Sequence, residues 1–200
     1  MTTKLIESVV TPARYEQGLS WQEWMASIDR NEEKFAENYA GFNPDPGDVT
    51  AIKGLVDKGA TKCLALGEAW CTDVVRGMPV MAKVSEQAGL DLKIFYRDQN
   101  LDIMNEFLKR GEFMSIPVFV FYTKDHRYLG HWIERAEKVK DEMPLMQEIS
   151  GPLRDPNTSS DDRARLMEEY AAFQRGPVWR GWQDAQVKEI RKLLEDNFKG

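Results

Sequence analysis

The chain has 200 residues, of which 42% are hydrophobic and 30% charged, and its formal net charge is −6. This length suits one domain with additions or two small domains, and the hydrophobic fraction is enough for a core. The negative charge argues against a nucleic-acid-binding protein, because no basic stripe offsets it. No apolar run approaches the roughly 20 residues that cross a membrane. Glu7 and Ser8 interrupt the apolar run near the N-terminus, so we predict a cytoplasmic protein with no membrane partner.

The N-terminal segment, residues 1–47, is predicted to be a helical extension. Residues from about 11 to 40 are expected to be helical, and Ser20 followed by Glu23 has the pattern of a capping box. Apolar residues then recur at helical spacing: Trp21, Trp24, Met25, Ile28 and Phe35. A cluster of helix-breaking residues at 43–48 marks the end of this extension.

The middle of the chain, residues 48–149, alternates between strand and helix patterns. Strands are predicted over 61–66, 92–96, 117–122 and 128–132. Helices are predicted over 73–88 with Pro79 inside, over 101–108 and over 136–149. Two crossovers followed by a hairpin predict a mixed sheet with helices on both faces.

The C-terminal segment, residues 150–200, is predicted to be a second helical extension. A linker is expected at 151–157, and Ser160 is expected to cap a charged helix that ends near Phe173. An amphipathic helix is predicted over 183–198. Four tryptophans of the two extensions are predicted to pack on the core or on each other: Trp21, Trp24, Trp179 and Trp182.

The sequence contains two cysteines, Cys63 and Cys71, which have different surroundings. Cys63 begins an apolar run that is typical of a buried strand, so we predict a small core residue. An extended chain rises about 3.3 Å per residue, so the two cysteines exceed the roughly 7 Å limit for bridged Cα atoms. Cys71 lies between a strand and a helix, where a helix N-terminus stabilises a thiolate. No cysteine–histidine cluster has zinc spacing, and we predict no metal.

Several short motifs resemble those of the thioredoxin family, over about residues 48–149. The stretch Trp70-Cys71-Thr72-Asp73-Val74 resembles the family's Trp-Cys-x-x-Cys, and most closely a bacterial branch with Trp-Cys-Gly-Asp-Cys. Pro79 stands where thioredoxins carry a helix-kinking proline, and Ile116-Pro117 precedes an apolar strand as the family's cis-proline does. Gly130 lies near the family's usual glycine in the last strand. The resemblance implies an α/β thioredoxin fold, to which the two helical extensions are added.

The departures from the family pattern concern its chemistry. Val74 replaces the cysteine that resolves a mixed disulfide, and Thr72 replaces the glycine of the bacterial branch. Ala65 stands where thioredoxins have a buried aspartate that helps to move protons at the second cysteine. Glu68 could substitute for this acid, but its position three residues before Cys71 favours a solvated strand end.

Cys71 is the candidate catalytic residue, and the resemblance implies substrate-binding residues around it. These are Trp70, Thr72, Ser115, Ile116 and Pro117. In one hypothesis, a monothiol oxidoreductase exchanges disulfides through Cys71, and glutathione, bacillithiol or a thiol of a partner protein releases the adduct. The residues imply no organic cofactor for this reaction.

A second hypothesis is a binding module that holds an extended peptide in the same groove without electron transfer. A third, a glutathione transferase, fits less well, because about 47 residues precede the first crossover unit. Whether the protein is an enzyme stays open from the sequence.

Overall fold

A computed structural model describes residues 8–198, and at its centre is a mixed sheet in the order β2–β1–β3–β4. The strands are β1 (Lys62–Gly67), β2 (Asp91–Tyr96), β3 (Val118–Tyr122) and β4 (Tyr128–Ile133). β2 runs parallel to β1, whereas β3 is antiparallel to β1 and β4 is antiparallel to β3. The strand predictions are confirmed, and their ends differ by at most one residue.

β1 and β3 form the middle of the sheet because their apolar side chains can be covered on both faces. Every residue of β3 is buried, and in β1 only Lys62 is partly exposed. A strand that is covered on both faces has a nearly continuous apolar sequence, as these two strands do. Cys63 is fully buried in β1 and is a free thiol, which confirms the prediction of a core residue.

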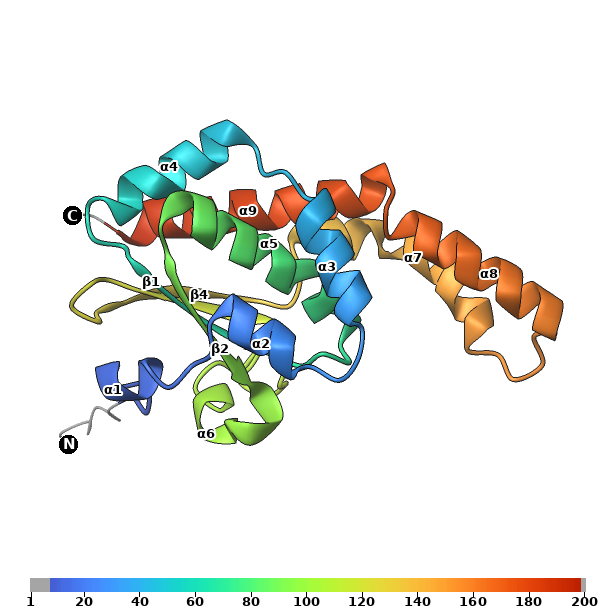
Figure 1. The fold of residues 1–200 in the computed structure, drawn as a ribbon, viewed down its shortest axis with the longest axis horizontal. Coiled ribbons are helices and arrows are strands. Elements are labelled where there is room, and N and C mark those ends of the chain that lie inside the picture. The colour runs from blue at the N-terminus through green and yellow to red at the C-terminus, as the bar shows by residue number, and fades with distance from the viewer. Residues whose placement is uncertain (1–7, 199–200) are drawn as a thin grey trace.

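Helices cover both faces of the sheet (Figure 1). On one side lie α4 (Pro46–Val56), α5 (Thr72–Ala88) and α9 (Pro177–Asn197), and on the other lie α1 (Pro12–Tyr15) and α6 (Leu101–Met104). α5 is the crossover between β1 and β2 and contains Pro79, as predicted. The short helix η1 (Arg97–Gln99) follows β2 directly.

The helix predicted over 101–108 is wrong in its length, because α6 ends at Met104. After Met104 the N–H groups of Glu106 and Phe107 bond to carbonyls only three residues back, and Arg110 and Gly111 then have positive φ angles. The chain turns there, and Lys109 pairs with Phe113 in an isolated antiparallel bridge.

The described residues of the N-terminal extension form α1, α2 (Trp21–Ser27) and α3 (Glu32–Gly41). α2 begins at the predicted capping box, in which Glu23 accepts a hydrogen bond from the Ser20 N–H at 2.8 Å. It ends at Ser27, because the backbone of the following Ile28 is extended, and Asn31 has a positive φ before α3 begins. These two residues separate α2 from α3 within the segment, about 11–40, that was expected to be helical.

The C-terminal helices begin and end at other residues than predicted. α7 (Glu137–Leu153) continues through Pro152, where a linker was expected, and α8 (Ser160–Phe173) is capped by Ser159 rather than Ser160. α9 begins at Pro177 instead of residue 183, because proline is tolerated in the first turn of a helix. α7 and α8 form a hairpin that projects away from the sheet (Figure 1).

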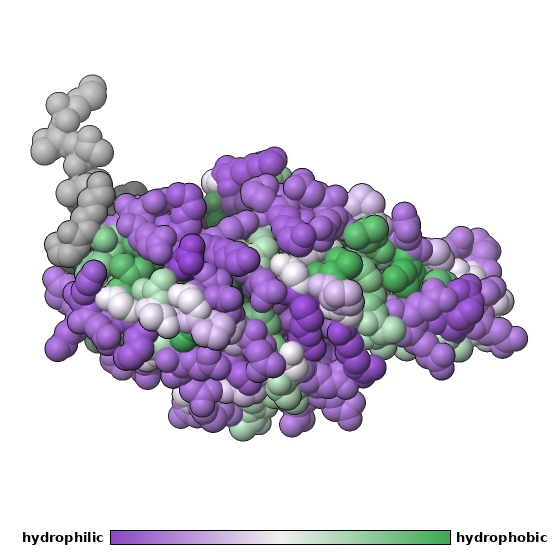
Figure 2. Space-filling model, turned by 90° about the horizontal axis from the view of Figure 1, so that it is seen from above, coloured by the Kyte–Doolittle hydropathy of each residue, from purple (hydrophilic) through white to green (hydrophobic). Residues whose placement is uncertain are grey.

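The tryptophans of both extensions belong to the hydrophobic core. Trp24, Trp179 and Trp182 are fully buried, and Trp21 is partly buried and stacks on Trp24 with ring centroids 5.7 Å apart. This burial confirms that the extensions pack on the core. Figure 2 shows one face of the molecule as mainly hydrophilic, with separate hydrophobic patches. In the described part of the chain, no helix is both long and apolar enough to cross a membrane.

Candidate functional site

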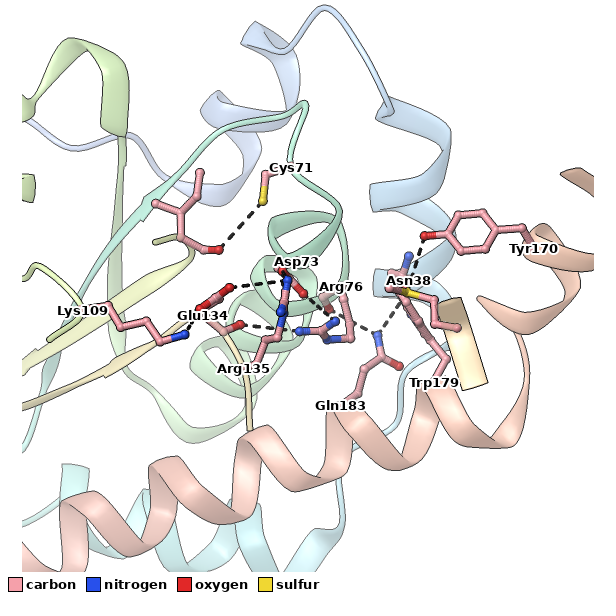
Figure 3. Close-up of polar contacts among 12 residues, drawn as sticks. Asn38, Cys71, Asp73, Arg76, Lys109, Glu134, Arg135, Tyr170, Trp179 and Gln183 are labelled. Carbon is pink, nitrogen blue, oxygen red and sulfur yellow. Dashed lines mark hydrogen bonds and ion pairs between the residues drawn. The ribbon is translucent and has the colours of Figure 1, made fainter. Parts of the chain in front are cut away.

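Cys71 is the N-cap residue of α5, at the end of the loop that leaves β1. Its Sγ lies 3.8 Å from the carbonyl oxygen of Ile116, and the Ile116–Pro117 peptide bond is cis (Figure 3). The fold therefore brings the cysteine and the isoleucine–proline pair together from segments that are far apart in the sequence.

Close packing of α5 against Pro117 fixes this arrangement. A Cβ atom at Gly77 would lie 3.2 Å from Cγ of Pro117 and 2.8 Å from Oε1 of Gln186. Gln186 of α9 also donates a hydrogen bond to the Gly77 carbonyl at 3.0 Å. A residue with a side chain would collide at this point, so the glycine allows α5, the proline loop and α9 to meet.

Trp70 lies at the surface directly before Cys71, with 48% of its area exposed. The guanidinium of Arg97 is 5.1 Å from the centre of its ring, which is the distance of a cation–π contact. Arg97 also donates a hydrogen bond to the Met114 carbonyl at 3.2 Å and so links Trp70 to the loop before Pro117. Ser115 is held in that loop by a backbone hydrogen bond to Phe113, and the described residues show no hydrogen bond between Ser115 and Cys71.

Burial raises the pKa of the Cys71 thiol above its ordinary value. The N–H group of Val74 acts in the opposite direction, because a hydrogen bond to the sulfur stabilises the thiolate, whereas the charge of Asp73 adds to the increase. Desolvation outweighs the helix N-terminus at this position. The first turn of α5 thus stabilises the Cys71 thiolate, but not enough to bring the pKa of the thiol below its ordinary value.

Two of the three positions that depart from the family pattern are buried, whereas Thr72 is exposed. Val74 and Ala65 are both completely inaccessible to solvent. Glu68 is buried as well, which contradicts the solvated strand end predicted for it, and its carboxylate accepts a hydrogen bond from the Asp98 N–H at 2.8 Å. Burial raises the pKa of Glu68. This carboxyl group fixes η1 next to the Cys71 loop.

A charged cluster beside Cys71 was not predicted from the sequence. Asp73 binds two guanidinium groups, that of Arg76 at 2.8 Å and that of Arg135 at 2.7 Å (Figure 3). Glu134 extends the cluster through ion pairs with Arg135 and Lys109. These contacts join the start of α5 to the chain that follows β4.

Arg76 is buried to 2% exposure, and its charge is stabilised by groups from distant parts of the chain. Its guanidinium lies 5.4 Å from the ring centre of Trp179 and 5.6 Å from that of Trp182, both on α9. Burial lowers the pKa of Arg76, while the ion pair with Asp73 opposes this effect. The only signal in the sequence is an aspartate three residues before an arginine, which is also common on exposed helices.

The α7–α8 hairpin reaches the start of α5 through Tyr170. The Tyr170 hydroxyl donates a hydrogen bond to Sδ of Met146 at 3.7 Å, which connects the two helices (Figure 3). Burial raises the pKa of Tyr170, and the nearby Thr72 side chain acts in the opposite direction. The C-terminal extension thus lies against the residue that follows Cys71. In the part of the chain that the structure describes, no group of three or more His, Cys, Asp or Glu side chains could hold a metal ion.

The mixed sheet, the cysteine at the start of the crossover helix and the cis-proline opposite it define a thioredoxin fold. The family model described as thioredoxin matches residues 18–150, and the chain belongs to this family. The match begins within the segment that the sequence predicts to be the N-terminal extension.

Two solved structures are similar to this chain. A protein of unknown function from Pseudomonas aeruginosa has a TM-score of 0.63 and 14% sequence identity, and the match covers 96% of this chain and 99% of that chain. An HIV epitope-scaffold has a TM-score of 0.61 and 14% identity, with 91% of this chain and 95% of that chain covered. At such low identity these two structures show the fold alone. A comparison with curated proteins finds no match.

Proposed function

We propose that the protein carries out thiol–disulfide exchange through Cys71, with a resolving thiol that comes from outside the chain. The observation that supports this best is the position of the Cys71 sulfur, at the start of α5 and 3.8 Å from the Ile116 carbonyl. Val74 and the buried Cys63 cannot resolve an adduct at this sulfur, so the reaction needs a second molecule.

The proposed reaction consists of two exchanges. The Cys71 thiolate attacks one sulfur of a substrate disulfide, forms a mixed disulfide with it and releases the other sulfur as a thiolate. An external thiolate then attacks the substrate sulfur of the mixed disulfide and restores the Cys71 thiolate. The external thiol belongs to a small molecule such as glutathione or bacillithiol, or to a partner protein.

The residues proposed to bind the substrate surround the sulfur. An extended substrate segment would lie between the exposed ring of Trp70 and the backbone of Ser115 and Ile116. Thr72 and Pro117 would form the ends of this groove.

A second candidate function is peptide binding in the same groove without electron transfer. The raised pKa of Cys71 favours this candidate, because a protonated thiol is a poor nucleophile. In that case Cys71→Ser retains partner binding, whereas substitutions at Trp70 or Pro117 abolish it.

Treatment of the native protein with oxidised glutathione, followed by mass spectrometry, distinguishes the two functions. Exchange predicts a glutathione adduct that accumulates on Cys71, because nothing inside the chain displaces it, and none on the buried Cys63. Cys71→Ser should abolish the adduct. A Cys71 thiol that stays unmodified after long exposure at mildly alkaline pH contradicts the exchange reaction and leaves the binding function.

A further inference from the structure

A second concave site lies at the other end of the sheet from Cys71. Cys71 follows the last residue of β1, whereas Tyr122 pairs with Lys62 at the first residue of the same strand. The cavity beside Tyr122 has a volume of about 520 Å³. Small-molecule sites commonly have volumes of roughly 300–1,000 Å³. The cavity is therefore large enough for a small organic ligand.

Aromatic rings form much of the wall of this cavity. They belong to Phe107, Tyr122, His126, Tyr128 and His131. The rings of Tyr122 and His126 are stacked with centroids 4.5 Å apart, and the Phe107 ring lies 5.3 Å from that of His131. Burial lowers the pKa of His131, which disfavours a positive charge on this imidazole. The faces of aromatic rings carry negative potential and attract cations.

The charge of the lining also favours a cation. Among the described residues, the lining contains the Glu106 carboxylate and neither lysine nor arginine. Ser8 Oγ and the Val9 N–H each donate a hydrogen bond of 2.6 Å to Glu106, and a carboxylate has capacity to accept more. The negative charge of Glu106, together with burial, raises the pKa of the Tyr122 hydroxyl on the same wall.

Hydrogen-bonding capacity is also unused at this wall. Tyr122 is only 3% exposed, and its hydroxyl has no hydrogen-bond partner among the residues that the structure describes. Nδ1 of His126 is likewise buried without a partner there. Nε2 of this ring lies 2.7 Å from the Val10 carbonyl and must donate to it, which leaves Nδ1 as the ring nitrogen open to a ligand. A ligand with N–H groups would match the acceptor that the Tyr122 hydroxyl provides.

We propose that this cavity binds a small organic amine in its protonated ammonium form. The ammonium group lies near Glu106, against the aromatic rings, and donates a hydrogen bond to the Tyr122 hydroxyl. An anion would meet a carboxylate in a lining whose described residues include no lysine or arginine, and a neutral ligand would gain less from that charge than a cation does. This site is separate from Cys71 and does not depend on the proposed exchange reaction.

The test is an NMR titration of the full chain at pH 7 with benzylamine, and with benzyl alcohol as a neutral probe of similar size. We expect benzylamine to shift the signals of Phe107, Tyr122 and His131 and to bind about tenfold more tightly than the alcohol. Cys71→Ser should bind benzylamine as the unaltered protein does. Equal affinity for the two probes, or shifts that lie around Cys71 instead, would overturn the proposal.

Two substitutions test the groups that are proposed to recognise the amine. Glu106→Gln keeps the shape of the side chain but removes its charge, and it should weaken benzylamine binding about tenfold. Tyr122→Phe removes only the unpartnered hydroxyl and should weaken binding several-fold while the chain stays folded. Glu112→Gln, at an exposed glutamate outside the lining, is the matched control and should have no effect. Unchanged affinity in both test variants contradicts the amine site.

Discussion

At the scale of single residues, two opposing effects act on the Cys71 thiol, and burial is the larger. The N–H groups of a helix N-terminus lower the pKa of a thiol, whereas the loss of water around the sulfur raises it, and the net shift depends on which effect is larger. Here the first turn of α5 does not compensate fully. The thiol stays mainly protonated at neutral pH, so any exchange reaction at Cys71 becomes faster as the pH rises.

The pH dependence of alkylation at Cys71 follows from this increase in pKa. A raised pKa leaves a smaller thiolate fraction at pH 7, and the rate with iodoacetamide should still be rising at pH 9.0, the ordinary pKa of a thiol. Mass spectrometry of the Cys71 peptide, sampled over time at each pH, gives the rate. A plateau reached below pH 8 would contradict the raised pKa and would favour the stabilised thiolate that the sequence predicts.

Val74→Cys tests whether the missing resolving cysteine is the main local difference from a dithiol site. Val74 is buried in the first turn of α5, three residues after Cys71, as in the family motif. The variant should form an internal disulfide on mild oxidation, detected as the loss of two thiols by titration. Val80→Cys, equally buried but further along α5, is the control and should keep its thiols. If Val74→Cys also keeps its free thiols, the geometry around Cys71 differs from that of a dithiol site.

At the scale of elements, the strands were predictable because their signals are local. Buried apolar runs such as Val118–Tyr122 specify a strand without information from elsewhere in the chain. Helix ends were less predictable, because packing can override a local helix breaker. α7 contains both Pro144 and Pro152 and nevertheless continues to Leu153, since it packs along α8.

Part of the site near Cys71 could be predicted from local motifs, and part of it could not. The contact between Cys71 and Ile116 was expected from two short motifs, each of which is complete within a few residues. Burial of Arg76 was not expected, because the tryptophans that cover it come from α9. An arginine can be recognised as a buried ion-pair residue only when its distant partners are known.

Asp73→Asn tests the ion pairs that join α5 to the rest of the molecule. The substitution leaves the buried Arg76 guanidinium without its carboxylate, and we expect a loss of about 3 kcal/mol in the free energy of unfolding. Chemical denaturation measures this loss. Asp161→Asn is the control, because Asp161 also lies in the first turn of a helix but is exposed, and it should change stability by less than about 1 kcal/mol. Equal effects of the two substitutions would mean that the buried pairs contribute no more than a helix-dipole interaction.

At the scale of the whole molecule, the C-terminal extension completes the core of the thioredoxin fold. α9 contributes Trp179 and Trp182 to the cover of Arg76, and Gln186 to the contact at Gly77. The N-terminal extension reaches the same region, where Asn38 accepts hydrogen bonds from Trp179 and Gln183. Residues 1–47, 48–149 and 150–200 were predicted as separate segments, and these contacts lead us to expect that they unfold together.

Trp182→Ala tests this cooperative unfolding. The Trp182 side chain is fully buried, and its Nε1 donates a hydrogen bond to Glu142 at 2.8 Å, so the substitution should cost about 3–5 kcal/mol. Because the extension shares the core, far-UV circular dichroism and tryptophan fluorescence should shift together to lower denaturant, as one transition. Trp70→Ala makes the same truncation at an exposed tryptophan and should change stability by less than about 1 kcal/mol. The result that would contradict this is two separate transitions. In that case part of the circular dichroism signal is lost at lower denaturant while the rest keeps its original midpoint, and the extension unfolds independently of the sheet.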